Sequence, residues 1–160
     1  MVEVDRNGLE VLDRSECLRL LSQASLGRVA FTSGALPCVL PVSFQLDDER
    51  ILVRTRSGGR LDLALRGSVV AFEVDDLDAD AHTGWSVSLT GCANAVCDPD
   101  ALGGARRTPI DRWTSSPDDS LVAISTEVLT GRRVTPDSGP TRLSSSGRAT
   151  PEAFRLASPR

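Results

Sequence analysis

The chain has 160 residues, a length typical of one domain, and its 40% hydrophobic and 25% charged residues are those of an ordinary globular protein. Its 18 basic residues are all Arg, and 22 acidic residues bring the net charge to -4, which disfavours a nucleic-acid-binding protein. Because Lys and Tyr are absent and His82 is the single histidine, Schiff-base chemistry on a side chain is excluded and most hydrolase mechanisms are disfavoured.

The location of the protein can be inferred from two further features of the sequence. No run of residues approaches the ~20 apolar positions of a membrane-spanning helix, and the first residues lack the basic and apolar regions of a secretion signal. None of the four cysteines, Cys17, Cys38, Cys92 and Cys97, lies in a C-x-x-C pair. We therefore expect a cytoplasmic protein with reduced thiols, no membrane partner and no metal site.

The first predicted element is a short helix over 12–21. Asp13 is a suitable N-cap because Glu16 follows three residues later, and an apolar stripe at helical spacing comes after it. The period then changes to that of strands over 26–32 and 36–46, separated by a turn at 33–35. Pro37 and Pro41 indicate an edge or a bulge in the second of these strands.

A third strand is predicted over 50–55, and short turns make this meander antiparallel. The chain then predicts a second helix over 61–66, a strand over 69–74, and an acidic loop over 75–80. A long strand over 84–96 is expected to bend at Gly91. The remaining predictions are a loop over 98–119, a last strand over 121–128, and a segment over 129–134 that extends or follows it.

These elements predict a mainly β fold. Six or so strands with short turns and two short helices favour a small antiparallel β-barrel, because a closed sheet leaves no unpaired edges. A β-sandwich fits the pattern nearly as well. Residues 1–134 would form the single domain, and residues 135–160, rich in Pro, Ser, Gly and Arg, would be a flexible tail.

The stretch from Arg54 to Leu61 is the strongest candidate binding site. It brings three guanidinium groups, two hydroxyls and backbone N–H groups to the end of a strand and the start of a helix. A phosphate monoester requires such donors, and the glycines Gly58 and Gly59 would let it approach the backbone. The alternative interpretation is a solvated basic turn with a glycine hinge.

The order of several blocks resembles the pyridoxamine 5'-phosphate oxidase-like superfamily, in its small actinobacterial branch of flavin- and deazaflavin-dependent oxidoreductases. The likeness covers roughly residues 8–134. The blocks that carry it are Leu12 to Leu18, Gly27 to Thr32, Pro41 to Phe44, Val53 to Thr55 with Gly59 to Leu61, Val70 to Asp75, Gly84 to Val87, and Thr130 to Arg133.

The resemblance implies an antiparallel split β-barrel of the FMN-binding type that forms a homodimer and binds its flavin between the subunits. It implies an oxidoreductase that passes hydride or electrons to a small organic substrate, with FMN as the first choice of cofactor and the deazaflavin coenzyme as the second. A flavin accepts hydride without a protein nucleophile, so the few acid-base residues are no obstacle. No catalytic residue is assigned.

The resemblance also implies which residues contact the cofactor. One strand would lie along the flavin ring, the basic turn would hold the phosphate, and a Trp-Ser pair would lie near the pocket. Arg60 stands where the family commonly has Lys. The implied cofactor-binding residues are Pro41, Val42, Ser43, Arg54, Thr55, Ser57, Gly59, Arg60, Leu61, Trp85 and Ser86.

Other interpretations remain open. The family often has an aromatic residue and an Arg on its last strand, where this chain has residues 120–124. A non-catalytic flavin- or haem-binding module and a cofactor-free dimer are therefore the alternatives. Trp85 could instead fill the barrel core, and Trp113 could lie at an interface or on the surface. We interpret His82 and the acidic run after Glu73 as solvated loop residues.

Overall fold

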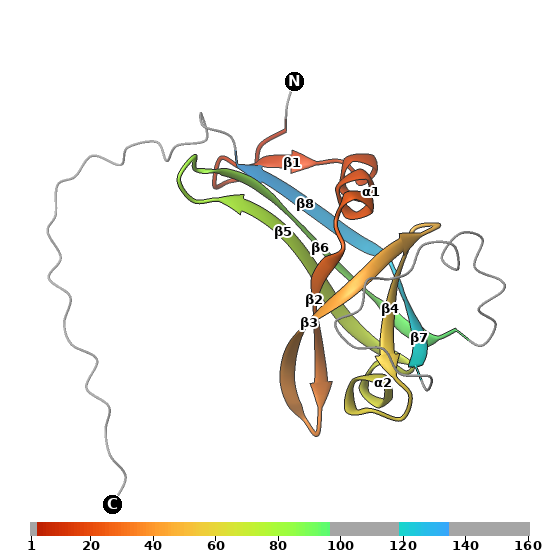
Figure 1. The fold of residues 1–160 in the computed structure, drawn as a ribbon. Helices are drawn as coiled ribbons and strands as arrows, with labels where there is room; N and C mark the ends of the chain where they lie inside the picture. Colours follow the sequence, from red (N-terminus) through yellow and green to blue (C-terminus); the bar gives the residue numbers. More distant parts are fainter. Residues whose placement is uncertain (1–2, 97–118, 135–160) are drawn as a thin grey trace, which may run out of the picture.

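The computed structural model describes residues 3–96 and 119–134 (Figure 1). These residues form eight strands and two helices. In chain order they are β1 (Glu10–Leu12), α1 (Arg14–Gln23), β2 (Leu26–Ser33), β3 (Leu36–Asp47), β4 (Arg50–Arg56), α2 (Arg60–Leu65), β5 (Ser68–Asp78), β6 (Thr83–Ala95), β7 (Asp119–Ser125) and β8 (Val128–Val134).

The strands form one antiparallel sheet that closes on itself. Six of them run in the order β6-β5-β2-β3-β4-β7, and pairing of β7 with β6 completes a barrel. β8 pairs with the remaining part of the same β6 edge, and β1 pairs with β8, so these two strands lie outside the barrel (Figure 1). The predicted mainly β fold, an antiparallel split β-barrel with two short helices, is confirmed.

Alternating side chains fill the barrel. In β2 the buried side chains Val29 and Phe31 alternate with exposed ones, because successive residues of a strand point to opposite faces. Phe44 and Phe72 meet edge to face with ring centroids 5.0 Å apart. The period-2 pattern therefore separates an inner, apolar face of each strand from an outer face.

Helix α1 packs against β8, β3 and β6 (Figure 1). Its predicted N-cap is confirmed, because the Asp13 carboxylate accepts a hydrogen bond of 2.8 Å from the Glu16 N–H. Cys17, Leu20 and Leu21 are its buried residues. The apolar stripe of the sequence therefore faces the core.

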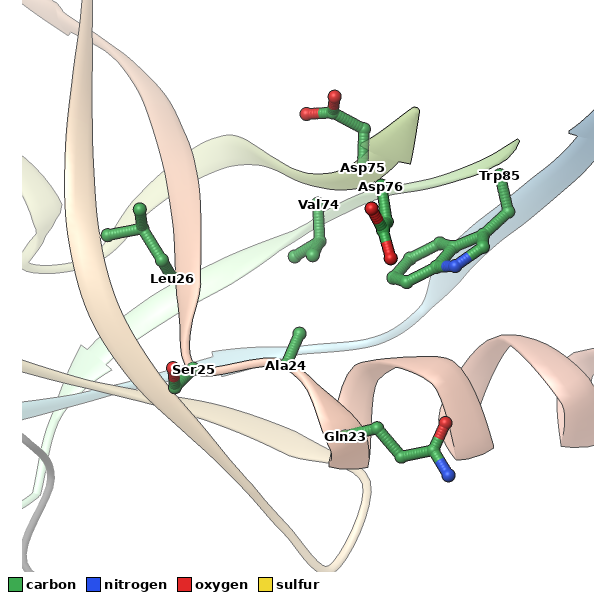
Figure 2. Close-up of a pocket in the computed structure, with 8 residues that line it drawn as sticks. All are labelled: Gln23, Ala24, Ser25, Leu26, Val74, Asp75, Asp76 and Trp85. Atoms are coloured by element: carbon green, nitrogen blue, oxygen red, sulfur yellow. The ribbon is translucent and has the colours of Figure 1, made fainter. Parts of the chain in front are cut away.

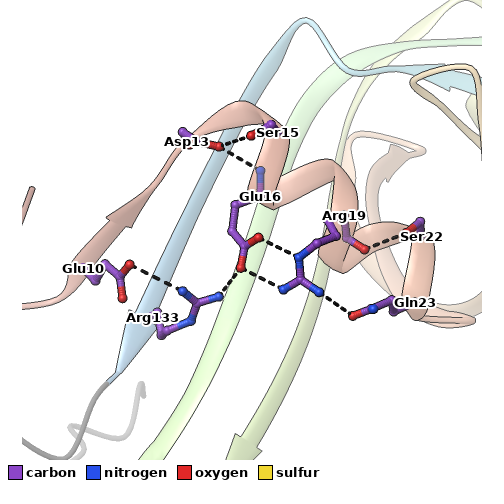
Figure 3. A network of polar contacts seen from close by, with 8 residues as sticks. All are labelled: Glu10, Asp13, Ser15, Glu16, Arg19, Ser22, Gln23 and Arg133. Atoms are coloured by element: carbon purple, nitrogen blue, oxygen red, sulfur yellow. Dashed lines mark hydrogen bonds and ion pairs between the residues drawn. The ribbon is translucent and has the colours of Figure 1, made fainter. Parts of the chain in front are cut away.

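Glu16 connects α1 to β8 (Figure 3). Its carboxylate accepts from the Arg19 guanidinium at 2.7 Å and from that of Arg133, which also contacts Glu10 at 3.4 Å. The hydrogen bonds from Arg19 and Arg133 lower the pKa of Glu16 from its ordinary 4.5 to about 2. The carboxylate therefore stays ionised well below the usual range, and the contact persists in mild acid.

The predicted acidic loop over 75–80 is wrong over its first four residues. Residues 75–78, expected in an acidic loop, continue β5 and pair with β6 up to Asp78 opposite Thr83. The Arg28 guanidinium contacts both Glu73 and Asp75, which neutralises part of the acidic run and allows it to pair as a strand. The short β1 has no counterpart among the predicted elements.

The predicted strand over 121–128 is two strands. β7 ends at Ser125 and β8 begins at Val128. Between them, the Thr126 hydroxyl donates to the Glu49 carbonyl at 2.7 Å and accepts from the Arg14 guanidinium at 2.9 Å, and these contacts interrupt the strand. Residues 129–134 accordingly belong to a separate strand.

Several predictions fall on residues that the structure does not describe. These are Cys97, Trp113, the loop over 98–119 except Asp119, which begins β7, and the tail over 135–160. In the described part of the chain, no helix is long and apolar enough to cross a membrane. Within the same residues, no three His, Cys, Asp or Glu side chains cluster in a way that could hold a metal ion.

Candidate functional site

The basic turn between β4 and α2 is tied to a buried carboxylate. Asp62 is fully buried and accepts hydrogen bonds from the Gly58 N–H at 2.9 Å, from Arg66 at 2.7 Å and from the Thr55 hydroxyl at 3.3 Å. Thr55 faces the barrel interior and is 6% exposed. The hydroxyl that the sequence suggested for phosphate binding thus donates to the protein itself.

The electrostatics of Asp62 follow from these contacts. Burial raises the pKa of this carboxyl, but the hydrogen bonds from Arg66 and the Gly58 N–H outweigh it, so the pKa lies below its ordinary value. Asp62 is therefore ionised at neutral pH, inside the end of the barrel. A carboxylate in this place holds the turn in its observed conformation.

Arg54 lies on the opposite face of β4 from Thr55. The register pairs Leu52 with Ala123 and Arg54 with Leu121. Leu52, Leu121 and Ala123 form, with Val96, a small apolar cluster separate from the barrel core. The Arg54 Nε is buried and has no hydrogen-bond partner within the described residues. A buried N–H donor without an acceptor costs about 1 to 3 kcal/mol. The Arg54 guanidinium is therefore a suitable partner for the acceptor atom of a ligand.

A second orphaned atom lies beside Arg54. Gln45 pairs with Leu52, which places it on the same outer face, and its Oε1 is also buried without a partner within the described residues. One unused donor and one unused acceptor therefore lie on the same face of β3 and β4, in diagonally neighbouring positions of the register. Polar ligands satisfy atoms of this kind.

The Arg60 guanidinium points to the β2–β3 hairpin. Its Nε donates to the Ser33 hydroxyl at 3.1 Å, and its Nη2 lies 3.2 Å from the Cys38 sulfur. Residues 38 and 43 of β3 are separated by about 17 Å of strand. Continuing the register from the Phe44–Val53 pair places Ser43 across from Arg54. Arg54 and Arg60 are therefore held at different points of β3 and do not converge.

The turn residues between the two arginines have their own contacts. Gly58 adopts a positive φ of 68°, and the Gly59 N–H donates to the Arg56 carbonyl at 2.9 Å. The N–H groups of Gly58 and Gly59, expected to bind an anion, are thus used within the chain. Ser57 and Arg56 are exposed, and Leu61 packs partly against the core.

The side chains of the predicted flavin-contacting residues of β3 point to two different faces of the sheet. In β3, Val42 packs against the core, whereas its neighbours Pro41 and Ser43 alternate to the outer face. Pro41 pairs with Arg28, which is itself exposed on β2. A flat ring on the outside of the barrel would therefore meet Pro41 and Ser43 rather than Val42.

The side chains of Trp85 and Ser86 also point to opposite faces of the sheet. Trp85 packs partly against the core, and Ser86 points to the other face, paired with Asp75 and Arg132. Trp85 lines a pocket of about 340 Å³ at the end of α1 (Figure 2). The lining residues are Gln23, Ala24, Ser25, Leu26, Val74, Asp75, Asp76 and Trp85.

The expected site residues thus form two groups. Pro41, Ser43, Arg54 and Ser86 lie on the outer face, and Val42, Thr55 and Trp85 lie on the inner one. Sequence reasoning missed Gln45 and Asp62. The sequence suggests that Asp62 faces solvent because it does not show that α2 packs against the barrel, whereas strand alternation could have placed Gln45 on the same face as Arg54.

The chain is similar in sequence to a mycobacterial protein. The chain is 42% identical over 132 residues to the uncharacterized protein Rv0080 of Mycobacterium tuberculosis, a match that covers 79% of this chain and 86% of that protein.

Two solved structures share the fold. A FAD-binding protein from Mycobacterium smegmatis is 33% identical, with a TM-score of 0.69 over 78% of this chain and 97% of its own. A FAD-binding protein from Mesorhizobium loti is 20% identical, with a TM-score of 0.66 over 79% of this chain and 99% of its own. The second likeness supports the fold alone.

A family model also matches this chain. It is described as pyridoxamine 5'-phosphate oxidase and covers residues 13–136. That span takes in both helices and seven of the eight strands of the structure, from α1 to β8. The chain therefore belongs to the pyridoxamine 5'-phosphate oxidase family.

Proposed function

We propose that the protein is a flavin-dependent oxidoreductase that binds its cofactor on the outer face of β3 and β4. The observation that carries the proposal is the buried Arg54 Nε, which has no acceptor within the described residues. Family membership and the name of the related FAD-binding protein support a flavin. FMN is the first choice, with the deazaflavin coenzyme and FAD as the other forms to compare.

The residues present fit such a group. Arg54 would give its unused N–H to a phosphate oxygen, a charge-assisted bond of about 1.5 to 3 kcal/mol. Pro41 and Ser43 would lie along the ring, and Gln45 would accept a hydrogen bond from a ring or ribityl N–H or O–H. Arg60 would join only after leaving Ser33, and a flavin in this position would not reach Trp85, which lies on the inner face.

The chemistry divides between cofactor and chain. A bound flavin supplies the group that takes up hydride or electrons from a small organic molecule. The chain's residues bind and orient it: Arg54 fixes the phosphate, and the outer face of β3 fixes the ring. The single histidine, His82, lies in the exposed turn between β5 and β6, so no proton transfer is assigned to it.

Arg54→Ala tests the cofactor site. We expect its affinity for FMN to fall about tenfold or more, and Arg54→Ala combined with Arg60→Ala to abolish binding while the circular dichroism of the barrel is kept. Flavin fluorescence during titration with FMN, FAD and the deazaflavin coenzyme measures these affinities. Arg6→Ala, the same charge change at an exposed residue, is the matched control.

Riboflavin separates the phosphate contact from the ring contact. Because riboflavin has no phosphate, Arg54→Ala should leave its affinity nearly unchanged. An equal FMN affinity of wild type and the double variant would remove Arg54 from the site. Turnover of the bound flavin with a reductant then distinguishes an oxidoreductase from a non-catalytic flavin- or haem-binding module.

We also propose that two copies of the chain pair through the outer face of the sheet. The register lines up five outward residues in one row across β3, β2, β5, β6 and β8: Val39, Ala30, Ala71, Thr90 and Val128. Val39 is 62% and Val128 59% exposed. This uncharged row lies beside Pro41, so a second copy seated on it would border the proposed flavin site.

Ala71→Arg is expected to convert the dimer into a monomer, because a guanidinium in the middle of this row would be desolvated without a partner. Sedimentation velocity over a range of concentrations measures the change. Leu63→Arg places the same side chain at an exposed apolar residue of α2 and should leave the dimer intact. A wild-type chain that stays monomeric contradicts the proposal.

A further inference from the structure

The pocket at the end of α1 is lined by none of the outer-face residues proposed to contact the flavin. It lies between the last residues of α1, the start of β2 and the paired strands β5 and β6 (Figure 2). Its volume of about 340 Å³ is that of a site for a small molecule. Val74, Asp76 and Trp85 line it from the inner face of β5 and β6, whereas the proposed flavin contacts Pro41, Ser43 and Arg54 lie on the outer face. Leu26, which also lines the pocket, is the cross-strand partner of Ser43.

An aromatic ring and a carboxylate face each other in this pocket. Asp76 and Trp85 are directly paired between β5 and β6, and their side chains point to the same side (Figure 2). The neighbouring Asp75 points away and contacts Arg28 on the other face. Within residues 3–96 and 119–134, no Arg forms an ion pair with the exposed Asp76.

The end of helix α1 adds negative potential to the same place. The last carbonyl groups of a helix carry a partial negative charge, and the last turn of α1 contains no basic residue to offset it. Among the residues that the structure describes, no Arg lines the pocket. Arg133, the cross-strand partner of Trp85 on β8, is engaged by the carboxylates of Glu10 and Glu16.

We propose that this pocket binds a small organic cation, a quaternary ammonium or a protonated amine. The indole face of Trp85 attracts a cation that lies against it, Asp76 supplies the opposite charge, and Val74 and Ala24 contact the carbon substituents. A bare metal ion fits less well, because it needs several oxygen ligands and the described residues offer no such cluster.

Choline and 3,3-dimethylbutan-1-ol are the probes that test the charge. The two molecules have nearly the same shape, but only choline carries a positive charge. In a Trp113→Phe background, the fluorescence of Trp85 reports binding directly. We expect choline to bind at least tenfold more tightly than the neutral alcohol, and sodium chloride to weaken choline binding alone. Equal affinities, or no response to either probe, overturn the proposal.

Asp76→Asn tests the carboxylate without changing its shape. Because Asp76 is exposed, the variant should fold normally, and its affinity for choline should fall about fivefold or more. Asp80→Asn makes the same charge change at an exposed residue of the β5–β6 turn and should not alter it. Unchanged choline affinity in Asp76→Asn contradicts the inference.

Titration of the same variants with FMN shows whether the cation site and the flavin site are separate. Asp76→Asn should keep the wild-type FMN affinity, and Arg54→Ala should keep the wild-type choline affinity. If FMN binding fails in every variant while choline still binds, the flavin proposal falls and the cation site stands. If Asp76→Asn lowers FMN and choline affinity together, the pocket belongs to the flavin site and the separate cation site is wrong.

Discussion

Gly91→Ala is expected to lower the free energy of unfolding by about 3 kcal/mol or more, because the new methyl group would have no space. A Cβ at this position would lie 1.9 Å from the Ser125 carbonyl oxygen and 2.8 Å from the Ser125 hydroxyl. The carbonyl belongs to the backbone and cannot rotate away. The close approach occurs where β7 ends, so relief of the clash requires a shift of the β6–β7 pairing that closes the barrel.

Urea unfolding followed by circular dichroism measures this effect. Gly34→Ala is the matched control: Gly34 has a φ of 57°, but nothing lies within 4 Å of the position that the new methyl group would take, so only the backbone conformation is penalised. That cost is about 1 to 2 kcal/mol. If Gly34→Ala destabilises the protein more than Gly91→Ala, the close approach at Ser125 does not limit the fold.

Gly91 also shows what the sequence could predict about the fold. The long alternation around Gly91 predicts one long strand, and β6 is such a strand, paired along one edge with β8 before Gly91 and with β7 after it. Likewise, Asp13 predicts the start of α1 because its partner, the Glu16 N–H, is three residues away. Features that depend on near neighbours in the chain were therefore predictable.

The predictions that were wrong depend on distant residues. The acidic end of β5 resembles a loop until Arg28, 45 residues from Glu73, is seen to contact it. The break between β7 and β8 depends on a hydrogen bond from Thr126 to Glu49, which is 77 residues away. Hydrophobic periodicity and local composition carry no information on contacts between residues so far apart in the chain. The sequence around each of these residues is ordinary for the element that was predicted there.

The candidate site was predictable to a similar extent. Charge and glycine content single out residues 54–61 in the sequence, but these two properties do not separate Arg54 from Thr55 or Arg60. Strand alternation separates the first two, and the hydrogen bond to Ser33 separates the third. The partner of Thr55, Asp62, lies on a helix whose position over the barrel end only the folded structure reveals.

Asp62→Ala is expected to destabilise the protein by about 3 kcal/mol. The substitution leaves the Gly58 N–H and the Thr55 hydroxyl without their acceptor, at a place where Asp62 is 0% exposed and water is excluded. Asp62→Asn should cost less, because its amide oxygen can still accept from one of these donors. Asp80→Asn, an exposed acidic residue, should have almost no effect on urea unfolding.

The pH dependence gives a second, independent signature of this carboxylate. The pKa of Asp62 in the folded protein lies below its ordinary value of 3.8, so its ionised form stabilises the fold. That stabilisation is complete above pH 3.8 and is lost as the pH falls through the lower folded pKa. The difference in unfolding free energy between wild type and Asp62→Asn should therefore be constant from pH 6 to 8 and shrink only below about pH 4. A difference that grows toward low pH would mean that Asp62 is protonated in the native barrel, and that the turn carrying Gly58 is held by something other than its charge.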